Sequence, residues 1–203
     1  FASGAVTFRR FFIVGEHPQR LGKKWLDALH AHAFGRHQTL SRDGVEFGWI
    51  KPTHLFDTDF TAPERLEVGR FVHLGLRIDR TAPPPAIVRS YRMMEEASRL
   101  AESGKLFLTR SEKKDAKESA LSRAEQEAKG GAFRRVSATP VLLDLEDGVV
   151  YFGNTGSATS DRLISLCADT FDVSLVPANA EEVAFRFAQR AGRPPVARRR
   201  TVA

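Results

Sequence analysis

Residues Lys105–Pro177 read KLFLTRSEKKDAKESALSRAEQEAKGGAFRRVSATPVLLDLEDGVVYFGNTGSATSDRLISLCADTFDVSLVP, a dense run of charge followed by a compact β-α-β pattern. Ser111–Lys129 is rich in Ala, Glu, Lys, Gln and Arg and stops at Gly130-Gly131, which predicts a helix. Its narrow apolar stripe consists of Ala116, Ala120, Leu121, Ala124 and Ala128. A helix this polar is typical of a segment that projects into solvent or covers a partner.

The second part of this stretch predicts a hairpin, a helix and a closing strand. Val141–Leu145 and Val149–Phe152 are apolar runs joined by Glu146-Asp147-Gly148, a hairpin turn signal. Asp161–Ala168 has helical periodicity, with Thr159 or Ser160 as its expected cap. A last strand is expected over Phe171–Val176.

The flanking sequence adds elements of both kinds. Gly69–Ile78 alternates strictly, with Val72, Leu74, Leu76 and Ile78 expected to face the core. Further strands are expected over Ala5–Val14 and Val45–Ile50, and further helices over 18–34, 86–103 and 181–189. From Ala191 onward Gly, Pro and Arg dominate, so disorder is expected.

This order of elements predicts an α+β fold, with a mainly antiparallel sheet, packed helices and a projecting central helical segment. Four parts are expected. An N-terminal α+β part covers 1–80, the projecting helices cover 81–131, and a hairpin/helix/strand/helix part over 132–190 packs with the first. A disordered basic tail covers 191–203.

Composition restricts the class of protein. With 203 residues and 42% apolar content the chain can bury a sizeable core. Cys167 is the single cysteine, which excludes a disulfide framework and a thiolate zinc site and fits a reducing cytoplasm. No apolar run is long enough for a membrane span, and Phe11–Val14 is too short for a signal peptide. A cytoplasmic protein without a membrane partner is therefore expected.

The positive charge is concentrated at the C-terminus. The chain has 31 basic and 25 acidic residues, but residues 186–203 hold six arginines and no acid. The remaining 185 residues are therefore neutral overall. If they bind nucleic acid, their charges must be segregated onto one face.

Candidate catalytic and metal-binding patterns are weak. His30, His32 and His37 are close in sequence, but His30 and His32 cannot share a helix face. His54, Asp57 and Asp59 could be carboxylate-rich ligands of a nuclease metal, although the aspartates more simply start turns.

The loop 154–160 could bind a phosphate through backbone N–H groups, but it lacks a Walker lysine, which favours helix capping. Cys167 lies on the apolar side of its helix and is expected in the core. No enzyme activity, catalytic residue, metal or cofactor is expected.

The order of short motifs across about residues 5–177 resembles the RdgC family, the recombination-associated DNA-binding proteins of bacteria. The matching segments are Gly48-Trp49 with Pro52, the strand 71–78 followed by Pro83-Pro84-Pro85, Glu112-Lys113-Lys114 with Lys117-Glu118, Ala132-Phe133-Arg134, and Asp144 with Gly148. Lys129-Gly130-Gly131 stands where the family tends to have leucine-leucine-proline. Family members usually continue for a second half, so the chain resembles the N-terminal half, with the C-terminal half absent.

The resemblance implies a non-enzymatic, nucleoid-associated protein that occupies double-stranded DNA, with single-stranded DNA as the alternative, without sequence preference and so modulates homologous recombination. It also implies a homodimer. The family's DNA-encircling dimer is built from both halves, so the resemblance leaves open whether the oligomer is a ring or has another geometry. The candidate phosphate contacts are Lys113, Lys114, Lys117, Arg123, Arg134, Arg135, Arg198, Arg199 and Arg200.

A second hypothesis keeps the RdgC-like fold but not the DNA. Glu112, Asp115, Glu118, Glu125 and Glu127 lie among the lysines and arginines of 111–129 and neutralise much of the helix. The chain would then be a scaffold or assembly module, whose helices and basic tail bind an acidic protein partner.

Overall fold

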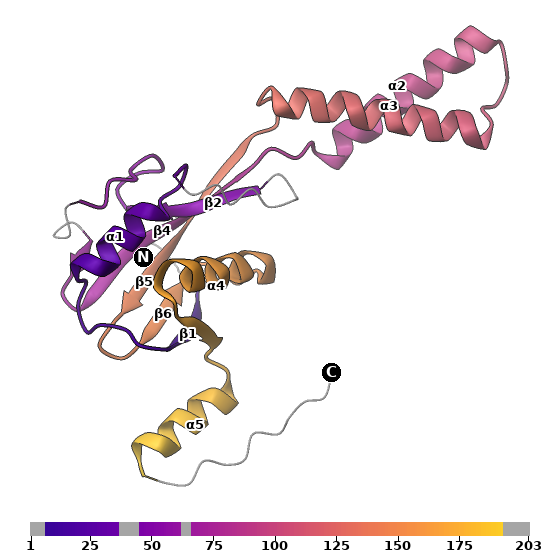
Figure 1. Cartoon of the computed structure of the whole chain (residues 1–203). Coiled ribbons are helices and arrows are strands. Elements are labelled where there is room, and N and C mark those ends of the chain that lie inside the picture. Colours follow the sequence, from indigo (N-terminus) through magenta and orange to yellow (C-terminus); the bar gives the residue numbers. More distant parts are fainter. Residues whose placement is uncertain (1–6, 37–44, 62–65, 193–203) are drawn as a thin grey trace. The chain divides into compact units, whose positions relative to one another are not determined.

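The computed structural model describes residues 7–36, 45–61 and 66–192 (Figure 1). The described residues form five helices and seven strands. The strands are β1 (Arg9–Val14), β2 (Val45–Ile50), β3 (Glu67–Val68), β4 (Phe71–Arg80), β5 (Arg135–Asp144), β6 (Val149–Phe152) and β7 (Ser174–Pro177). The helices are α1 (Lys23–Ala31), α2 (Pro85–Ser103), α3 (Arg110–Lys129), α4 (Ser157–Phe171) and α5 (Ala180–Arg190).

The strands belong to one sheet with the order β2-β4-β5-β6-β1-β7, and β3 pairs with β4. The pairs β1/β6, β1/β7, β3/β4 and β5/β6 are antiparallel. The predicted α+β class with antiparallel pairing is therefore confirmed.

Close packing divides the chain into two units. We name residues 1–37, 48–77 and 138–203 the body, and residues 38–47 and 78–137 the hairpin unit. The body contains α1, α4, α5, β1, β6, β7 and most of β5, and the hairpin unit contains α2 and α3.

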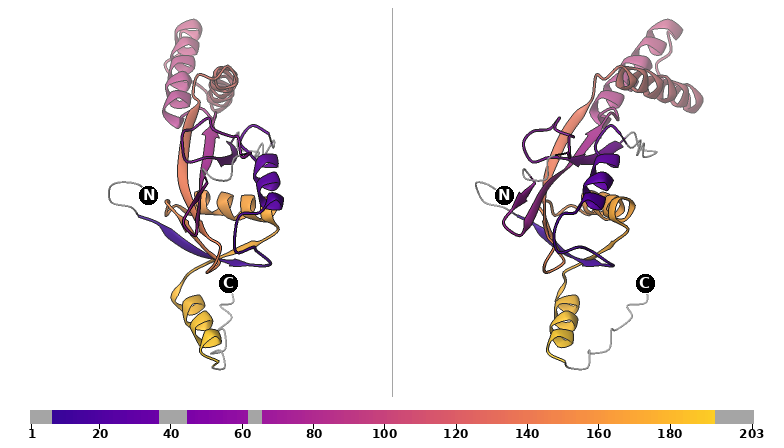
Figure 2. Two further views of the ribbon diagram at one scale, coloured as in Figure 1. Left: turned by 90° about the vertical axis from the view of Figure 1, so that its left-hand side faces the viewer. Right: turned by 60° about the vertical axis from the view of Figure 1, so that its left-hand side comes forward.

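The core of the body lies between the sheet and two helices. The register of β1, β5 and β6 places Phe11, Val150 and Leu143 side by side on one face, and all three are buried. Helices α1 and α4 lie on one side of these strands (Figure 2). Trp25 of α1 stacks on Phe171 of α4, with ring centroids 4.1 Å apart. These contacts fix α1 and α4 against each other.

Several predicted boundaries in the body are wrong, among them the start of β5, which is at Arg135 and not at Val141. Helix α4 begins at Ser157, so Thr159 and Ser160 lie inside it and do not cap it. The Asn154 carboxamide oxygen accepts the Gly156 N–H at 2.7 Å, and this turn starts the helix earlier than the sequence pattern predicted. Phe171 ends α4 and does not open β7.

Helix α1 begins at Lys23, later than the predicted start at Pro18. The backbone N–H of Leu21 instead donates to the Glu67 carboxylate at 3.0 Å, which holds the preceding segment outside the helix. The strand predicted over 45–50 is confirmed as β2.

Alanines hold the hairpin unit together. Ala116, Ala120, Ala124 and Ala128 of α3 are all buried, whereas the predicted stripe member Leu121 is exposed. Small side chains allow α2 and α3 to approach closely, and no residue of α2 is fully buried. Helix α3 begins with a capping box, in which Thr109 Oγ1 accepts the Glu112 N–H and the Glu112 carboxylate accepts the Thr109 N–H.

Candidate nucleic-acid interface

The connection between α2 and α3 presents two apolar side chains to solvent. Leu106 is 87% exposed and Phe107 is 83% exposed, whereas the next residue, Leu108, is buried. Gly104 ends α2 in the left-handed conformation, with φ 63°, which glycine adopts without steric cost. We name Leu106 and Phe107 the tip of the hairpin.

The carboxylates of α3 nearest to the tip are engaged with α2 and the connection. Lys105 Nζ lies 2.7 Å from Glu112 Oε1, and Arg99 lies 3.9 Å from Asp115. Hydrogen bonds from Lys105 and from Thr109 lower the pKa of Glu112 to about 2. These carboxylates therefore neutralise cations within the hairpin.

The far end of the hairpin has a second polar cluster. Tyr91 of α2 donates to the Glu127 carboxylate at 2.6 Å, and this hydrogen bond raises the pKa of the tyrosine. Arg123 lies over the Tyr91 ring at 4.3 Å and 3.4 Å from Glu127. Arg123, one of the predicted phosphate contacts, is thus part of the packing between α2 and α3.

A different flank of α3 carries exposed cations. Among the described residues, Arg110, Lys113 and Lys117 have no ion-pair partner. At about 100° per residue, positions 110, 113 and 117 fall within roughly 60° of one another around the helix. Lys114 lies close by, 3.7 Å from the exposed Glu118. We name Arg110, Lys113 and Lys117 the cationic flank.

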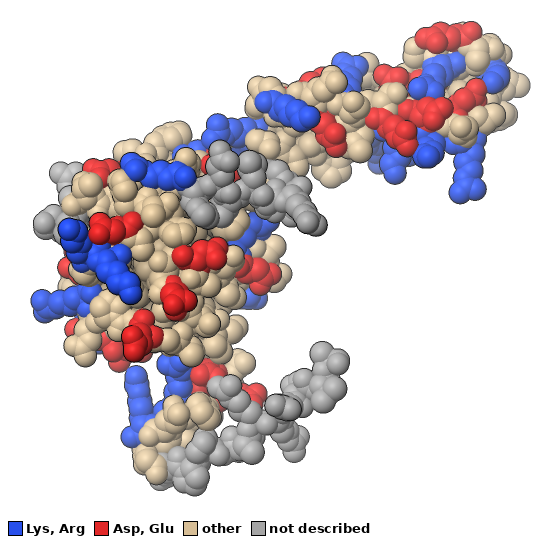
Figure 3. Space-filling view, viewed as in Figure 1, with Lys and Arg blue, Asp and Glu red and all other residues tan. Residues whose placement is uncertain are grey.

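The space-filling view agrees with this segregation. Figure 3 shows Lys and Arg side chains along the lower edge of the part of α3 next to the connection, with Asp and Glu side chains above them. Residues 78–137 contain 13 Lys and Arg against nine Asp and Glu, so the net charge of this segment is positive. The rest of residues 1–185 has more acidic than basic residues. The hairpin unit therefore carries an excess of positive charge.

Helix α2 extends the positive surface. A shallow hollow of about 490 Å³ lies between the two helices, lined by Pro83, Pro85, Val88, Arg89, Arg92, Lys117, Leu121 and Glu125. Arg92 is partly neutralised by Glu96, at 2.7 Å. Arg89, which has no ion-pair partner in the described part of the chain, adds a free charge beside Lys117.

The remaining predicted phosphate contacts have different surroundings. Arg134 binds the buried Asp79 carboxylate through two hydrogen bonds, at 2.9 and 2.6 Å, so it balances a buried charge. Arg135, at the start of β5, is exposed. Arg198, Arg199 and Arg200 and the predicted disordered tail beyond Gly192 lie outside the described residues.

The predicted functional residues did not include Arg89, Arg110, Leu106 or Phe107. Arg110 could have been found, because it shares the spacing of Lys113 and Lys117 on one helix face. Arg89 could not, because its position beside Lys117 depends on how α2 packs against α3.

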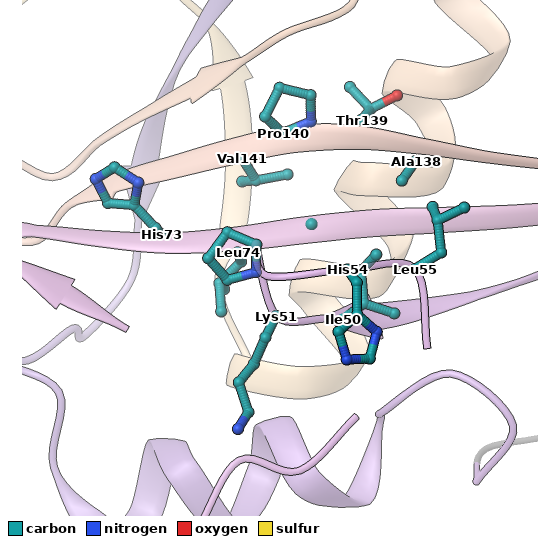
Figure 4. Close-up of a pocket in the computed structure, with 12 residues that line it drawn as sticks. Ile50, Lys51, His54, Leu55, His73, Leu74, Ala138, Thr139, Pro140 and Val141 are labelled. Atoms are coloured by element: carbon teal, nitrogen blue, oxygen red, sulfur yellow. The ribbon is translucent and has the colours of Figure 1, made fainter. Parts of the chain in front are cut away.

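The body has an apolar cavity of its own, of about 370 Å³ (Figure 4). It lies beside β4 and β5, under the segment that follows β2, and its lining includes Ile50, Leu55, Gly75 and Pro140. The Lys51 side chain points away from it and pairs with Asp57 at 3.3 Å. Burial lowers the pKa of His73, another lining residue, which favours a neutral imidazole. The cavity is therefore suited to apolar groups.

The weaker candidates have structural roles. The Asp57 carboxylate accepts the Thr53 hydroxyl at 2.6 Å and pairs with Lys51, and Asp59 accepts from Thr61. Among the residues that the structure describes, no three His, Cys, Asp or Glu side chains are close enough to hold a metal ion. His37 lies outside the described residues.

Cys167 is part of the core. Its side chain is buried in α4, and this burial raises the pKa of the thiol. A thiol held in its protonated form is a poor nucleophile.

No protein-family model matches this chain, and no curated protein matches it. Within the described residues, no helix combines the length and the apolar character needed to cross a membrane.

Proposed function

We propose that this chain is an RdgC-like DNA-binding protein that occupies DNA without sequence preference and thereby modulates homologous recombination. The order of its motifs along residues 5–177 supports the family. The observation that carries the DNA-binding function is the cationic flank, because Arg110, Lys113 and Lys117 are exposed, have no ion-pair partner among the described residues and lie on one side of α3.

Binding would be electrostatic. Lysine and arginine side chains on the flank and in the adjoining hollow, including Arg89, contact phosphates and release the counterions that the phosphates hold. Such contacts carry no base information, so duplexes of different sequence bind alike. The bound protein then covers DNA that a recombinase would otherwise occupy, and no chemical step is required.

We propose that the protein acts as a homodimer. Val183 and Phe187 of α5 are exposed large apolar residues on one helix of the body. A surface of this kind is typical of an interface with another chain.

The salt dependence of binding tests the DNA proposal. We would measure the affinity for labelled duplexes of different sequence by fluorescence anisotropy between about 50 and 200 mM salt. Replacing Lys113 and Lys117 by Gln removes two phosphate contacts, which should flatten the slope of log K against log salt by about 1.8. The effect should be the same for every duplex.

Lys23→Gln/Lys24→Gln is the matched control. These two exposed lysines lie on α1 and lack an ion-pair partner in the described residues, so their loss gives the same change in net charge. The control should keep the wild-type slope. An equal loss of slope in both variants would mean that net charge, and not the cationic flank, determines binding.

A scaffold that binds an acidic protein partner is the second candidate. The observation that favours it is the apolar cavity of the body, which no described side chain occupies and which suits a partner's apolar residue. If the wild-type protein shows no salt-dependent DNA binding, this candidate takes the lead.

A further inference from the structure

The tip consists of two large apolar side chains that are adjacent in sequence and almost fully exposed to solvent. Leu106 and Phe107 are adjacent, and each is more exposed than any other large apolar residue in the described part of the chain. Isolated exposed apolar residues are common on protein surfaces, but a pair at the end of a hairpin presents a continuous apolar point. Neither side chain contributes to the packing of α2 on α3.

The tip is held by well-defined structure on both sides. Gly104 N–H donates to Leu100 O at 3.0 Å, which closes the last turn of α2. On the other side, Leu108 is buried, and the capping box fixes the first turn of α3. The bond between Lys105 and Glu112 ties the start of the connection to α3. The two apolar side chains therefore lie on a short connection whose flanking residues are bonded to α2 and α3.

The cationic flank begins directly behind the tip. From Arg110 to Lys117 it extends for roughly 10 Å along α3, at about 1.5 Å per residue. A membrane surface is planar and would attract cations placed at a single depth around an apolar point. A groove of DNA instead has phosphates along its walls, so a row of cations that runs back from the point matches the groove better.

We infer that the tip is a wedge that enters a base step of the bound DNA, with Phe107 and Leu106 against the base faces and the cationic flank on the adjoining phosphates. This inference rests on the proposed DNA-binding function. Apolar side chains inserted between base steps partly unstack them, and aromatic rings stack on bases of any sequence. The wedge therefore adds contact area without adding sequence preference.

The test uses a duplex that contains 2-aminopurine, whose fluorescence rises when its base is unstacked. The variant is Leu106→Ser/Phe107→Ser. Its control is Met93→Ser/Met94→Ser, because these methionines of α2 are also exposed, by 62% and 56%, but lie away from the tip. Circular dichroism of all three proteins checks that the helices are retained.

We expect wild-type protein and the methionine control to raise the fluorescence at saturation. The tip variant should bind with the wild-type salt slope, leave the fluorescence unchanged, and lose about five- to 150-fold in affinity, the value of stacking on one base. A fluorescence rise in the tip variant equal to that of wild type would overturn the wedge while leaving the DNA-binding function intact.

Two other results are also decisive. If wild-type protein shows no salt-dependent binding, the proposed function and the wedge both fail. If wild-type protein binds DNA without raising the fluorescence, and binds vesicles of phosphatidylcholine and phosphatidylserine through the tip, the wedge is overturned and the tip is a membrane contact.

Discussion

The stability of the hairpin should depend on the alanines of α3 to an extent that can be calculated. Because α2 has no fully buried residue, the contact between the helices relies on the buried methyl groups of Ala116, Ala120, Ala124 and Ala128. Ala120→Gly removes one of these methyl groups near the middle of the helix. The lost burial costs about 0.8 kcal/mol, and glycine in a helix interior costs about 1 kcal/mol relative to alanine. The expected loss is therefore about 1.8 kcal/mol.

Ser119→Gly is the matched control, since Ser119 is exposed and adjacent. It changes only helix propensity, by about 0.5 kcal/mol. Hydrogen exchange of the α3 amides measures the free energy of local opening. Exchange should accelerate about twentyfold in Ala120→Gly and about twofold in Ser119→Gly, at one decade per 1.4 kcal/mol.

The comparison isolates the contact between the helices from the propensity of the single helix. If both variants accelerate exchange equally, the methyl group of Ala120 contributes nothing to the packing. The two helices would then be held together mainly by the polar pairs at their ends, such as Tyr91 with Glu127.

Two further predictions concern charged groups. Arg70 binds Asp147 and also Asp144, whose side chain is buried. Arg70→Gln should therefore lower the melting temperature by several degrees, because it leaves a buried carboxylate without its partner. Arg36→Gln, on the exposed surface, should not change the melting temperature, and equal melting temperatures of the two variants would contradict this prediction. The pKa of Glu112 lies at about 2, below its ordinary 4.5, so its contribution to stability is complete above about 4.5 and is lost as pH falls through about 2. An NMR titration of the Glu112 carboxyl should give this midpoint in wild type and a higher one in Lys105→Met, because the hydrogen bond from Lys105 is the main cause of the lowered pKa. An unchanged midpoint in Lys105→Met would show that this hydrogen bond does not lower the pKa.

Local patterns predicted the elements of this chain well where one physical signal dominated. The alternation of Val72, Leu74 and Leu76 predicted β4, because a strand with a buried face requires a period of two. The alanine stripe predicted the buried face of α3, although the exposed Leu121 was wrongly included because it lies at the edge of the stripe. The start of α4 was missed because Asn154 forms a turn before the first good capping residue.

The candidate site was less predictable than the fold, since its charges depend on contacts between distant residues. Nothing in the local sequence shows that Arg134 binds Asp79, or that Arg123 lies over Tyr91. These pairs give two cations of the predicted set a partner within the hairpin unit, and the packing of α2 places Arg89 beside Lys117. Exposure of Leu106 and Phe107 was equally unpredictable, because the same two residues could have been part of a core.

Strands β4 and β5 are neighbours in the sheet, yet the whole hairpin lies between them in the chain. An unfolded connection of about 50 residues would weaken the pairing of two strands by about 2 kcal/mol relative to a four-residue turn, because closing a longer loop costs more entropy. The folded pair of helices removes most of this penalty by ordering its own residues. Mutations that lengthen or shorten α2 and α3 together, in steps of whole turns, should thus leave the sheet undisturbed. Evolution could adjust the reach of the tip independently of the scaffold that carries it.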